Sequence, residues 1–317
     1  MYFTSIHGII QSIANTIFLK FDRSIILETS FGFTAKKLRV AKNINVKDIA
    51  GEIISYPQIL KFENGQTMIS VDKLIYILNY INVSLEEFEQ ARHELIKTSD
   101  LALNQQVDVA FWNKNISKLK YLLKDAQTYL LNFPDNPRYI MNIIEIKAAL
   151  RYLDSNYKIS QYDIDDLVEY LLSINEWSKY EIWLFSNCVG LISNIKDDKC
   201  LKGLTNKMLY AESHNFHSKE NQSKINIALM NVISIFISNQ NYEPIHDWFL
   251  YLEEHIYSDV DMYERATFTY LKALYNFRRD TCNQYKLERV EKCISAFETL
   301  GCFNLVNLMN DELNGYR

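Results

Sequence analysis

The segment from Gly32 to Phe88 decides the fold, and its sequence is GFTAKKLRVAKNINVKDIAGEIISYPQILKFENGQTMISVDKLIYILNYINVSLEEF. Apolar residues recur in it at helical spacing, in short runs separated by residues typical of helix ends. We expect five short helices, namely residues 33–41, one that begins near Asn45, one that begins at Ser55, residues 71–79, and one that is capped by Ser84. The segment therefore predicts a small module built only of helices.

The second and third of these helices have the spacing of a helix-turn-helix. Ala50 supplies the small residue needed where the two helices meet. Polar side chains stand at the start of the second helix, where they reach base edges in the major groove. A glutamine there can pair with adenine through both atoms of its amide. We predict that DNA is bound by the following side chains: Lys36, Arg39, Lys47, Ser55, Tyr56, Gln58 and Lys61.

The distribution of charge agrees with that prediction. The whole chain carries a formal net charge of −5, but between Gly32 and Gly65 there are six basic residues and three acidic ones. This segment thus carries +3, and the rest of the chain carries −8. A basic segment in an acidic protein is typical of a local phosphate-binding surface.

Residues 99–317 show long amphipathic helical patterns with brief interruptions, and glycine (8) and proline (4) are scarce in the 317-residue chain. Successive helices of this length stack as antiparallel pairs. Leu167–Leu172 (LVEYLL) and Trp248–Leu252 (WFLYL) resemble each other, and their tyrosines lie 81 residues apart, about twice the roughly 34–45-residue period of helical-hairpin repeats. We predict an all-α protein in three parts: an N-terminal extension (1–30), a helix-turn-helix domain (31–98) and a helical-repeat domain (99–317).

The residues also resemble a known family. Ile54, Ser55, Gln58, Phe62, Glu63 and Gly65 form an ISxxQxxxFExG element that is similar to the Xre/Cro-type helix-turn-helix of the Rgg/GadR/MutR regulators. The resemblance continues in three later segments: Glu169–Asn187 (EYLLSINEWSKYEIWLFSN), Ala228–Ile237 (ALMNVISIFI) and Phe268–Phe277 (FTYLKALYNF). It covers about residues 28–310. The chain departs from the family at Ser55–Leu60, where Ser-Tyr-Pro-Gln-Ile-Leu replaces Ser-x-Ser-Gln-Leu-Ser. We expect Tyr56 and Leu60 to change which bases are read or to weaken binding.

The resemblance implies a tetratricopeptide-like second domain that forms a homodimer and binds a short hydrophobic peptide. Amide side chains both donate and accept, so Asn187 and Asn231 suit the backbone of an extended peptide. Arg151 suits a peptide carboxylate. Trp183, Tyr270 and Phe277 are candidates for apolar pockets. Ordinary hydrogen bonding between helices is the alternative role for Asn187, Asn231 and Arg151, and a place in the core is the alternative for Trp183.

Other classes of function lack support in the sequence. No nucleophile elbow, P-loop, dinucleotide-binding fingerprint or zinc-protease motif is present, so we expect no enzyme, no cofactor and no metal. No apolar stretch approaches the roughly 18–20 residues of a membrane span. The five cysteines form no CxxC pair, which predicts reduced thiols and a cytoplasmic protein.

Two alternatives and one point about the N-terminus remain open. The first alternative is a regulator that is not controlled by a peptide. The second is a helical-repeat scaffold whose N-terminal module binds protein rather than DNA. Members of the resembled family usually begin a few residues before the equivalent of Gly32. We therefore expect that residues 1–26 stem from an upstream start, with Leu27 as the initiator.

Overall fold

The computed structural model describes residues 30–96, 102–134, 136–195, 197–215, 219–256 and 258–316. The chain divides after Gln105 into two compact units, and each is described by itself below. Every regular element among the described residues is a helix, which confirms the predicted all-α class. The predicted extension (1–30) lies, apart from Ser30, outside the described residues. So does the predicted domain boundary, which falls within residues 97–101.

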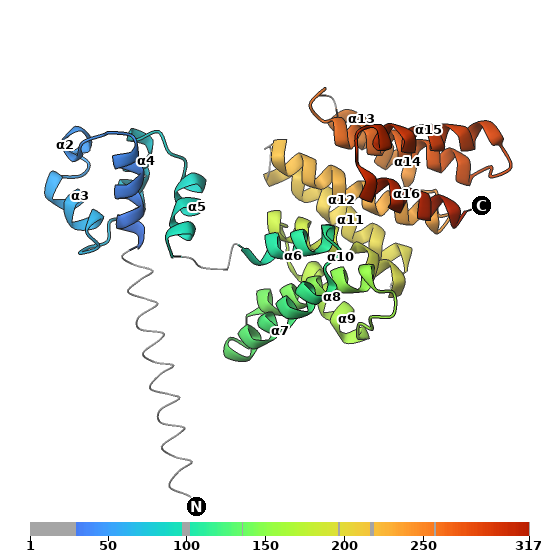
Figure 1. Cartoon of the computed structure of the whole chain (residues 1–317), viewed down its shortest axis with the longest axis horizontal. Helices are drawn as coiled ribbons and strands as arrows, with labels where there is room; N and C mark the ends of the chain where they lie inside the picture. Colours follow the sequence, from blue (N-terminus) through green and yellow to red (C-terminus); the bar gives the residue numbers. More distant parts are fainter. Residues whose placement is uncertain are drawn as a thin grey trace, which may run out of the picture. The chain divides into compact units, whose positions relative to one another are not determined.

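The first unit contains the five expected helices (Figure 1). They are a first helix over residues 30–41, α2 (Val46–Ile49), α3 (Tyr56–Glu63), α4 (Val71–Tyr80) and α5 (Leu85–Ile96). Caps set the starts of these helices, as predicted. The N–H of Asn45 donates to Asp48 Oδ2 at 3.0 Å, and the N–H of Ser84 donates to Glu87 Oε2 at 2.7 Å. Such side chains satisfy N–H groups that a helix start otherwise leaves without a partner.

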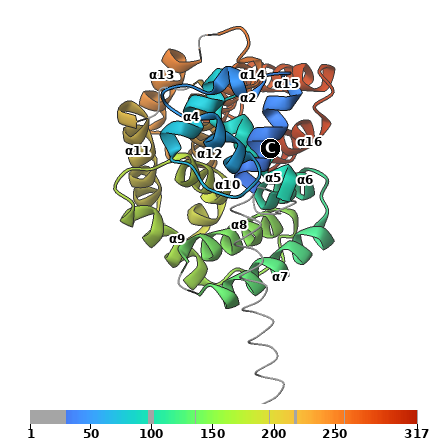
Figure 2. The ribbon, with the colours of Figure 1, turned by 90° about the vertical axis from the view of Figure 1, so that its left-hand side faces the viewer.

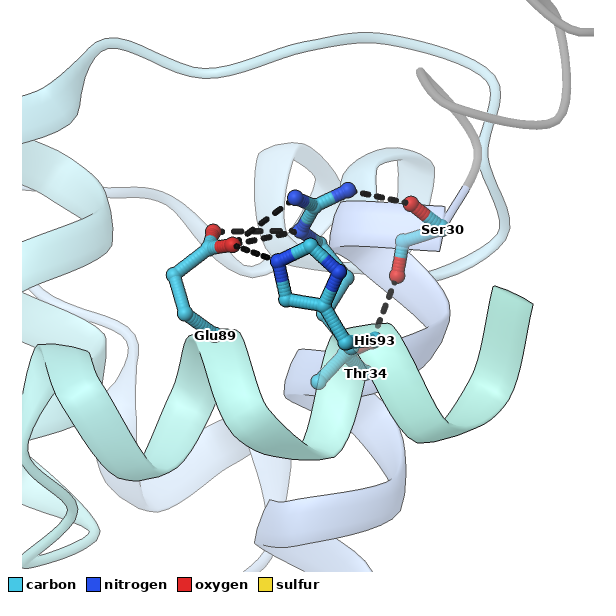
Figure 3. Close-up of polar contacts among 5 residues, drawn as sticks. Ser30, Thr34, Glu89 and His93 are labelled. Atoms are coloured by element: carbon cyan, nitrogen blue, oxygen red, sulfur yellow. Dashed lines mark hydrogen bonds and ion pairs between the residues drawn. The ribbon is translucent and has the colours of Figure 1, made fainter. Parts of the chain in front are cut away.

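The first helix is held against α5 by a buried polar cluster, shown in Figure 3. Arg92 of α5 is buried, donates to Glu89 one turn earlier, and reaches the hydroxyl of Ser30 at 3.4 Å. Its guanidinium also lies 4.4 Å from the centre of the Phe31 ring. Thr34 completes the cluster by donating to the carbonyl of Ser30 at 2.7 Å. The burial of Arg92 is tolerated because its donors are used.

The first helix also packs directly on the end of α3. A Cβ added at Gly32 would lie 1.7 Å from the carbonyl oxygen of Phe62 and 3.3 Å from the Cα of Glu63. Backbone therefore meets backbone here, with no room for a side chain. Phe62 and Ile59 of α3 lie in the same apolar core as Ala35 of the first helix.

The second unit consists of paired helices in two rows. Helix α6 (Ala102–Trp112) spans the division between the units. The helices that follow it are α7 (Ile116–Asn132), α8 (Pro137–Leu153), α9 (Gln161–Ser173), α10 (Lys179–Ile195), α11 (Asp198–Asn215), α12 (Lys219–Ser238), α13 (Ile245–His255), α14 (Met262–Arg278), α15 (Gln284–Thr299) and α16 (Phe303–Asn314). One row is α8, α10, α12 and α14, each in contact with the next, and we call it the inner row. Helices α7, α9, α11, α13 and α15 pack beside the inner row. In Figure 2 the colours of α7, α9, α11 and α13 change in this order from green through yellow to orange.

The internal similarity found in the sequence corresponds to this arrangement. LVEYLL lies in α9 and WFLYL lies in α13, and both helices pack outside the inner row, with α11 between them in sequence. The two segments are thus two hairpins apart, as their spacing predicts. All five cysteines are free. None of the helices described is both long and apolar enough to span a membrane.

We predict that Gly32→Ala destabilises the first unit by about 3 kcal/mol, the upper end for overpacking, because a backbone carbonyl cannot move aside as a side chain can. Faster hydrogen–deuterium exchange of peptides from residues 30–96 of the full chain would show it. Gly51→Ala is the matched control, since nothing lies within 4 Å of a Cβ added there. Equal exchange in the two variants would contradict the assigned contact.

Candidate functional site

Helix α3 presents most of the predicted base-reading side chains together. Ser55 is the N-cap residue, and Pro57 lies in the first turn, where a missing N–H costs little. Ser55, Tyr56, Gln58 and Lys61 are exposed on this helix. The opposite face of α3 is buried through Ile59 and Phe62. The amphipathic pattern of α3 thus leaves its N-terminal end free for a partner.

Exposed lysines lie around this helix in the first unit. The ammonium groups of Lys47 (α2) and Lys61 (α3) make no hydrogen bond or ion pair among the described residues. Lys36 of the first helix is also exposed, and its ammonium donates to Asn64 Oδ1 at 3.0 Å, just beyond α3. These cations are therefore available to phosphate oxygens at little cost.

Arg39 corrects the sequence-based prediction. It is only 8% exposed, and its Nε and one terminal nitrogen donate to the two carboxylate oxygens of Glu63, each at 2.7 Å. The other terminal nitrogen donates to the carbonyl of Ile44 at 2.6 Å. Arg39 therefore joins the first helix to the end of α3 inside the protein and does not reach a phosphate. Since Glu63 leaves the surface with it, the exposed charge of the segment stays at +3.

Two of the predicted peptide-binding residues lie close together in the second unit. Asn187 of α10 and Asn231 of α12 are both exposed on neighbouring helices of the inner row. The amide nitrogen of Asn231 lies 3.4 Å from the hydroxyl of Ser186, the residue before Asn187. Trp183 is half-buried one turn before Asn187, on the same side of α10. The fold thus gathers two amides and one indole.

A buried carboxyl group adjoins Asn187. Glu145 of α8 is 2% exposed, and its Oε1 accepts from the amide nitrogen of Asn187 at 3.0 Å. Its Oε2 has no hydrogen-bond partner among the described residues. Burial raises the pKa of Glu145 well above its ordinary value. Burial therefore disfavours the charged form of Glu145, so the carboxyl group that accepts from Asn187 is shifted toward its neutral form.

The structure contradicts two other predicted pocket residues. Phe277 is 1% exposed and lies in the apolar core, so it lines no open surface. Tyr270 is 2% exposed, and its hydroxyl donates to Glu312 Oε2 of α16 at 3.0 Å. Burial raises the pKa of Tyr270, so its hydroxyl stays protonated and able to donate. Their apolar character suggested a pocket, but the sequence did not show what covers this face of α14.

Helix α16 is bonded to the inner row through Glu312. The carboxylate accepts from the hydroxyls of Ser234 (2.8 Å), Tyr270 (3.0 Å) and Tyr316 (3.2 Å). Helix α16 thus holds α12 and α14 together. Arg151, the remaining predicted residue, is half-buried in the last turn of α8, and its guanidinium makes no hydrogen bond or ion pair in the described part of the chain.

Glu145 and Glu312 were missed by the reading of the sequence. A signal existed for Glu145, because it interrupts the apolar run Ile143, Ile144 and Ile146, and a carboxyl group inside such a run is either paired or neutral. No comparable signal marks Glu312, which lies in a polar stretch near Asp311. Within the described residues, no group of His, Cys, Asp and Glu is placed to hold a metal ion.

We predict that Arg39→Met destabilises the protein by about 3–5 kcal/mol, because it leaves the Glu63 carboxylate buried without a partner. The double variant Arg39→Met/Glu63→Leu should regain most of this loss, since an apolar pair removes both desolvation costs. Urea unfolding of the wild type, both single variants and the double variant measures the coupling. Additive losses would mean that the two groups do not interact.

Comparison with known proteins agrees with this architecture. Residues 132–311 match the family model described as HTH-type transcriptional regulator Rgg, C-terminal domain, and residues 36–88 match a helix-turn-helix model. The structure is similar to that of the Streptococcus dysgalactiae SHP pheromone receptor Rgg2, with a TM-score of 0.73, 23% identity, and coverage of 90% of this chain and 100% of that one.

Two further solved structures share the fold. A putative transcriptional regulator from Listeria monocytogenes EGD-e matches with a TM-score of 0.73 and 15% identity, covering 91% of this chain and 97% of that one. The PrgX/cCF10 complex matches with a TM-score of 0.66 and 16% identity, covering 90% and 99%. The Rgg model alone spans more than half of the sequence, and the helix-turn-helix precedes it in the same chain. The protein therefore belongs to the Rgg family of HTH-type transcriptional regulators.

Proposed function

We propose that this protein binds specific double-stranded DNA through its first unit and a short hydrophobic peptide through its second. One observation carries the DNA half of the proposal. The exposed start of α3, with Ser55, Tyr56 and Gln58, lies in a unit with exposed lysines and a rigid internal ion pair. A recognition helix reads bases with its N-terminal residues while neighbouring cations contact phosphates.

In this proposal Lys36, Lys47 and Lys61 contact the DNA backbone. Each phosphate that a lysine neutralises releases counterions, so binding weakens as salt rises. Base edges are left to the side chains at the start of α3. The local positive charge also explains how a protein with a net charge of −5 approaches an anionic polymer.

The peptide half of the proposal rests on Asn187 and Asn231. An extended peptide carries N–H and C=O groups along its backbone, and an asparagine amide can donate to one and accept from another. The indole of Trp183 offers adjacent apolar surface, and the guanidinium of Arg151 suits a carboxylate. The similar streptococcal protein is described as a pheromone receptor, and PrgX forms a complex with cCF10. Another similar structure is that of a bacterial peptide pheromone/receptor complex, and together these descriptions support peptide binding here.

A homodimer would connect the two halves. Two first units would meet two DNA half-sites, whose spacing is fixed by the duplex. A peptide that binds one arrangement of the dimer better than another shifts the population toward it. Regulation then follows from the difference in affinity between the two arrangements.

The DNA proposal predicts steep salt dependence for duplex DNA taken from beside the protein's own gene. Lys61→Ala should reduce the slope of log affinity against log salt by about 1. Lys124→Ala, the same change on an exposed lysine of α7, should leave the slope unchanged. Fluorescence anisotropy at several salt concentrations measures both. Affinity that does not change with salt would favour the scaffold alternative, in which the first unit binds protein.

The peptide proposal predicts binding of labelled short hydrophobic peptides to the wild-type protein, measured by fluorescence polarisation. Asn231→Ala should weaken the best binder by about 5- to 10-fold, the worth of one or two hydrogen bonds. The matched control is Asn276→Ala, because among the described residues the Asn276 amide bonds within its own helix, to the carbonyl of Lys272. Equal affinities of the two variants would remove Asn231 from the site.

A further inference from the structure

The side chain of Gln58 folds back on the start of its own helix. Its Oε1 accepts from the backbone N–H of Ser55 at 3.2 Å and from the hydroxyl of Ser55 at 3.3 Å. This is a capping box, in which the third residue of the helix satisfies the N–H of the N-cap residue. An amide oxygen has two lone pairs, so the accepting capacity of Gln58 is used within the protein.

The amide nitrogen of Gln58 keeps its two N–H donors. It makes no hydrogen bond among the described residues, and the side chain is exposed at the end of α3 that faces outward. Gln58 thus offers donors to a partner and no acceptor. Tyr56 and Pro57 precede it in the first turn, and Pro57 restricts the backbone there, which keeps the box in place.

The bases differ in what they offer such a donor in the major groove. Pairing with adenine needs both atoms of the glutamine amide, because adenine presents an acceptor at N7 and a donor at its N6 amino group. Guanine presents two adjacent acceptors, N7 and O6. Thymine presents one acceptor beside a methyl group, and cytosine presents a donor. A side chain with donors alone therefore fits guanine best.

We propose that Gln58 reads guanine through its amide nitrogen, with Ser55 as the residue that positions it. The proposal rests on DNA binding by the first unit and replaces the adenine pairing expected from the sequence. To pair with adenine, the oxygen of Gln58 would have to release at least one of its two contacts with Ser55. Both contacts hold the side chain folded over the start of α3, so this pairing would loosen the cap each time DNA is bound.

Selection from a randomised duplex DNA library, using the full-length protein at low salt, tests the proposal. Gln58→Ala identifies the position in the selected sequences that depends on this side chain. We expect guanine there in the wild type, favoured about tenfold over adenine, and no preference in Gln58→Ala. In Gln58→Glu one carboxylate oxygen still caps Ser55, while the other accepts from a base, so the preference should change to cytosine.

A second variant separates positioning from stability. Ser55→Ala removes one of the two donors to Oε1, so adenine should rise relative to guanine at that position. A purely structural loss would weaken all sequences alike. Gln66→Glu is the charge control, because it makes the same change at an exposed residue just beyond α3 and should leave every preference as in the wild type. Far-ultraviolet circular dichroism checks that each variant is folded.

The outcomes are distinguishable. Adenine at the Gln58-dependent position, or no position that depends on Gln58, would overturn the guanine assignment while leaving DNA binding intact. Failure of the folded wild type to enrich any sequence would instead overturn the proposed DNA binding itself. A preference for guanine in the wild type that changes to cytosine in Gln58→Glu, and in no other variant, would establish the assignment.

Discussion

The bidentate ion pair between Arg39 and Glu63 joins the first helix to the end of α3 in the interior of the first unit. Two buried charges are tolerated because each pairs with the other, and the carbonyl of Ile44 accepts from the terminal nitrogen that does not contact Glu63. The absent side chain of Gly32 lets the two backbones approach at the same place. The orientation of α3 is therefore fixed from the interior of the unit, by buried groups that are not available to a partner. Its exposed start can then be rigid.

Most of the fold was predictable because helix ends carry local signals. Asn45, Ser55 and Ser84 each precede a helix, and the capping partner stands three residues later in every case. Arg39 shows the limit of such reasoning. A basic residue on a basic helix looks like a phosphate contact, and only the tertiary fold reveals that Glu63, 24 residues later, meets it in the core. Tyr270 failed similarly, because periodicity cannot say that α16 lies over it.

Across the second unit, polar side chains of the inner row satisfy one another between helices. Glu145 bonds to Asn187, Asn231 reaches Ser186, and Ser234 bonds to Glu312. Such contacts link each helix of the row to its neighbour or to α16. A ligand that bonds to the amide of Asn187 therefore changes the surroundings of the buried Glu145 carboxyl group on α8. Helix α8 lies two places along the inner row from α12, which carries one of the Glu312 contacts. The type and position of Asn187 and Asn231 singled them out in the sequence, but their contacts with Glu145 and Ser186 needed the fold.

Helix α16 has a consequence for the order in which the chain acquires its structure. Its Glu312 bonds to residues that lie 42 and 78 positions earlier, and its Asn304 contacts the carbonyl of Trp112, 192 positions earlier. The stacked hairpins, by contrast, pair with near neighbours and can form as they leave the ribosome. During synthesis the hydroxyls of Ser234 and Tyr270 emerge long before their acceptor. The contacts that close the unit around Glu312 are therefore the last of these bonds to become possible as the chain is made.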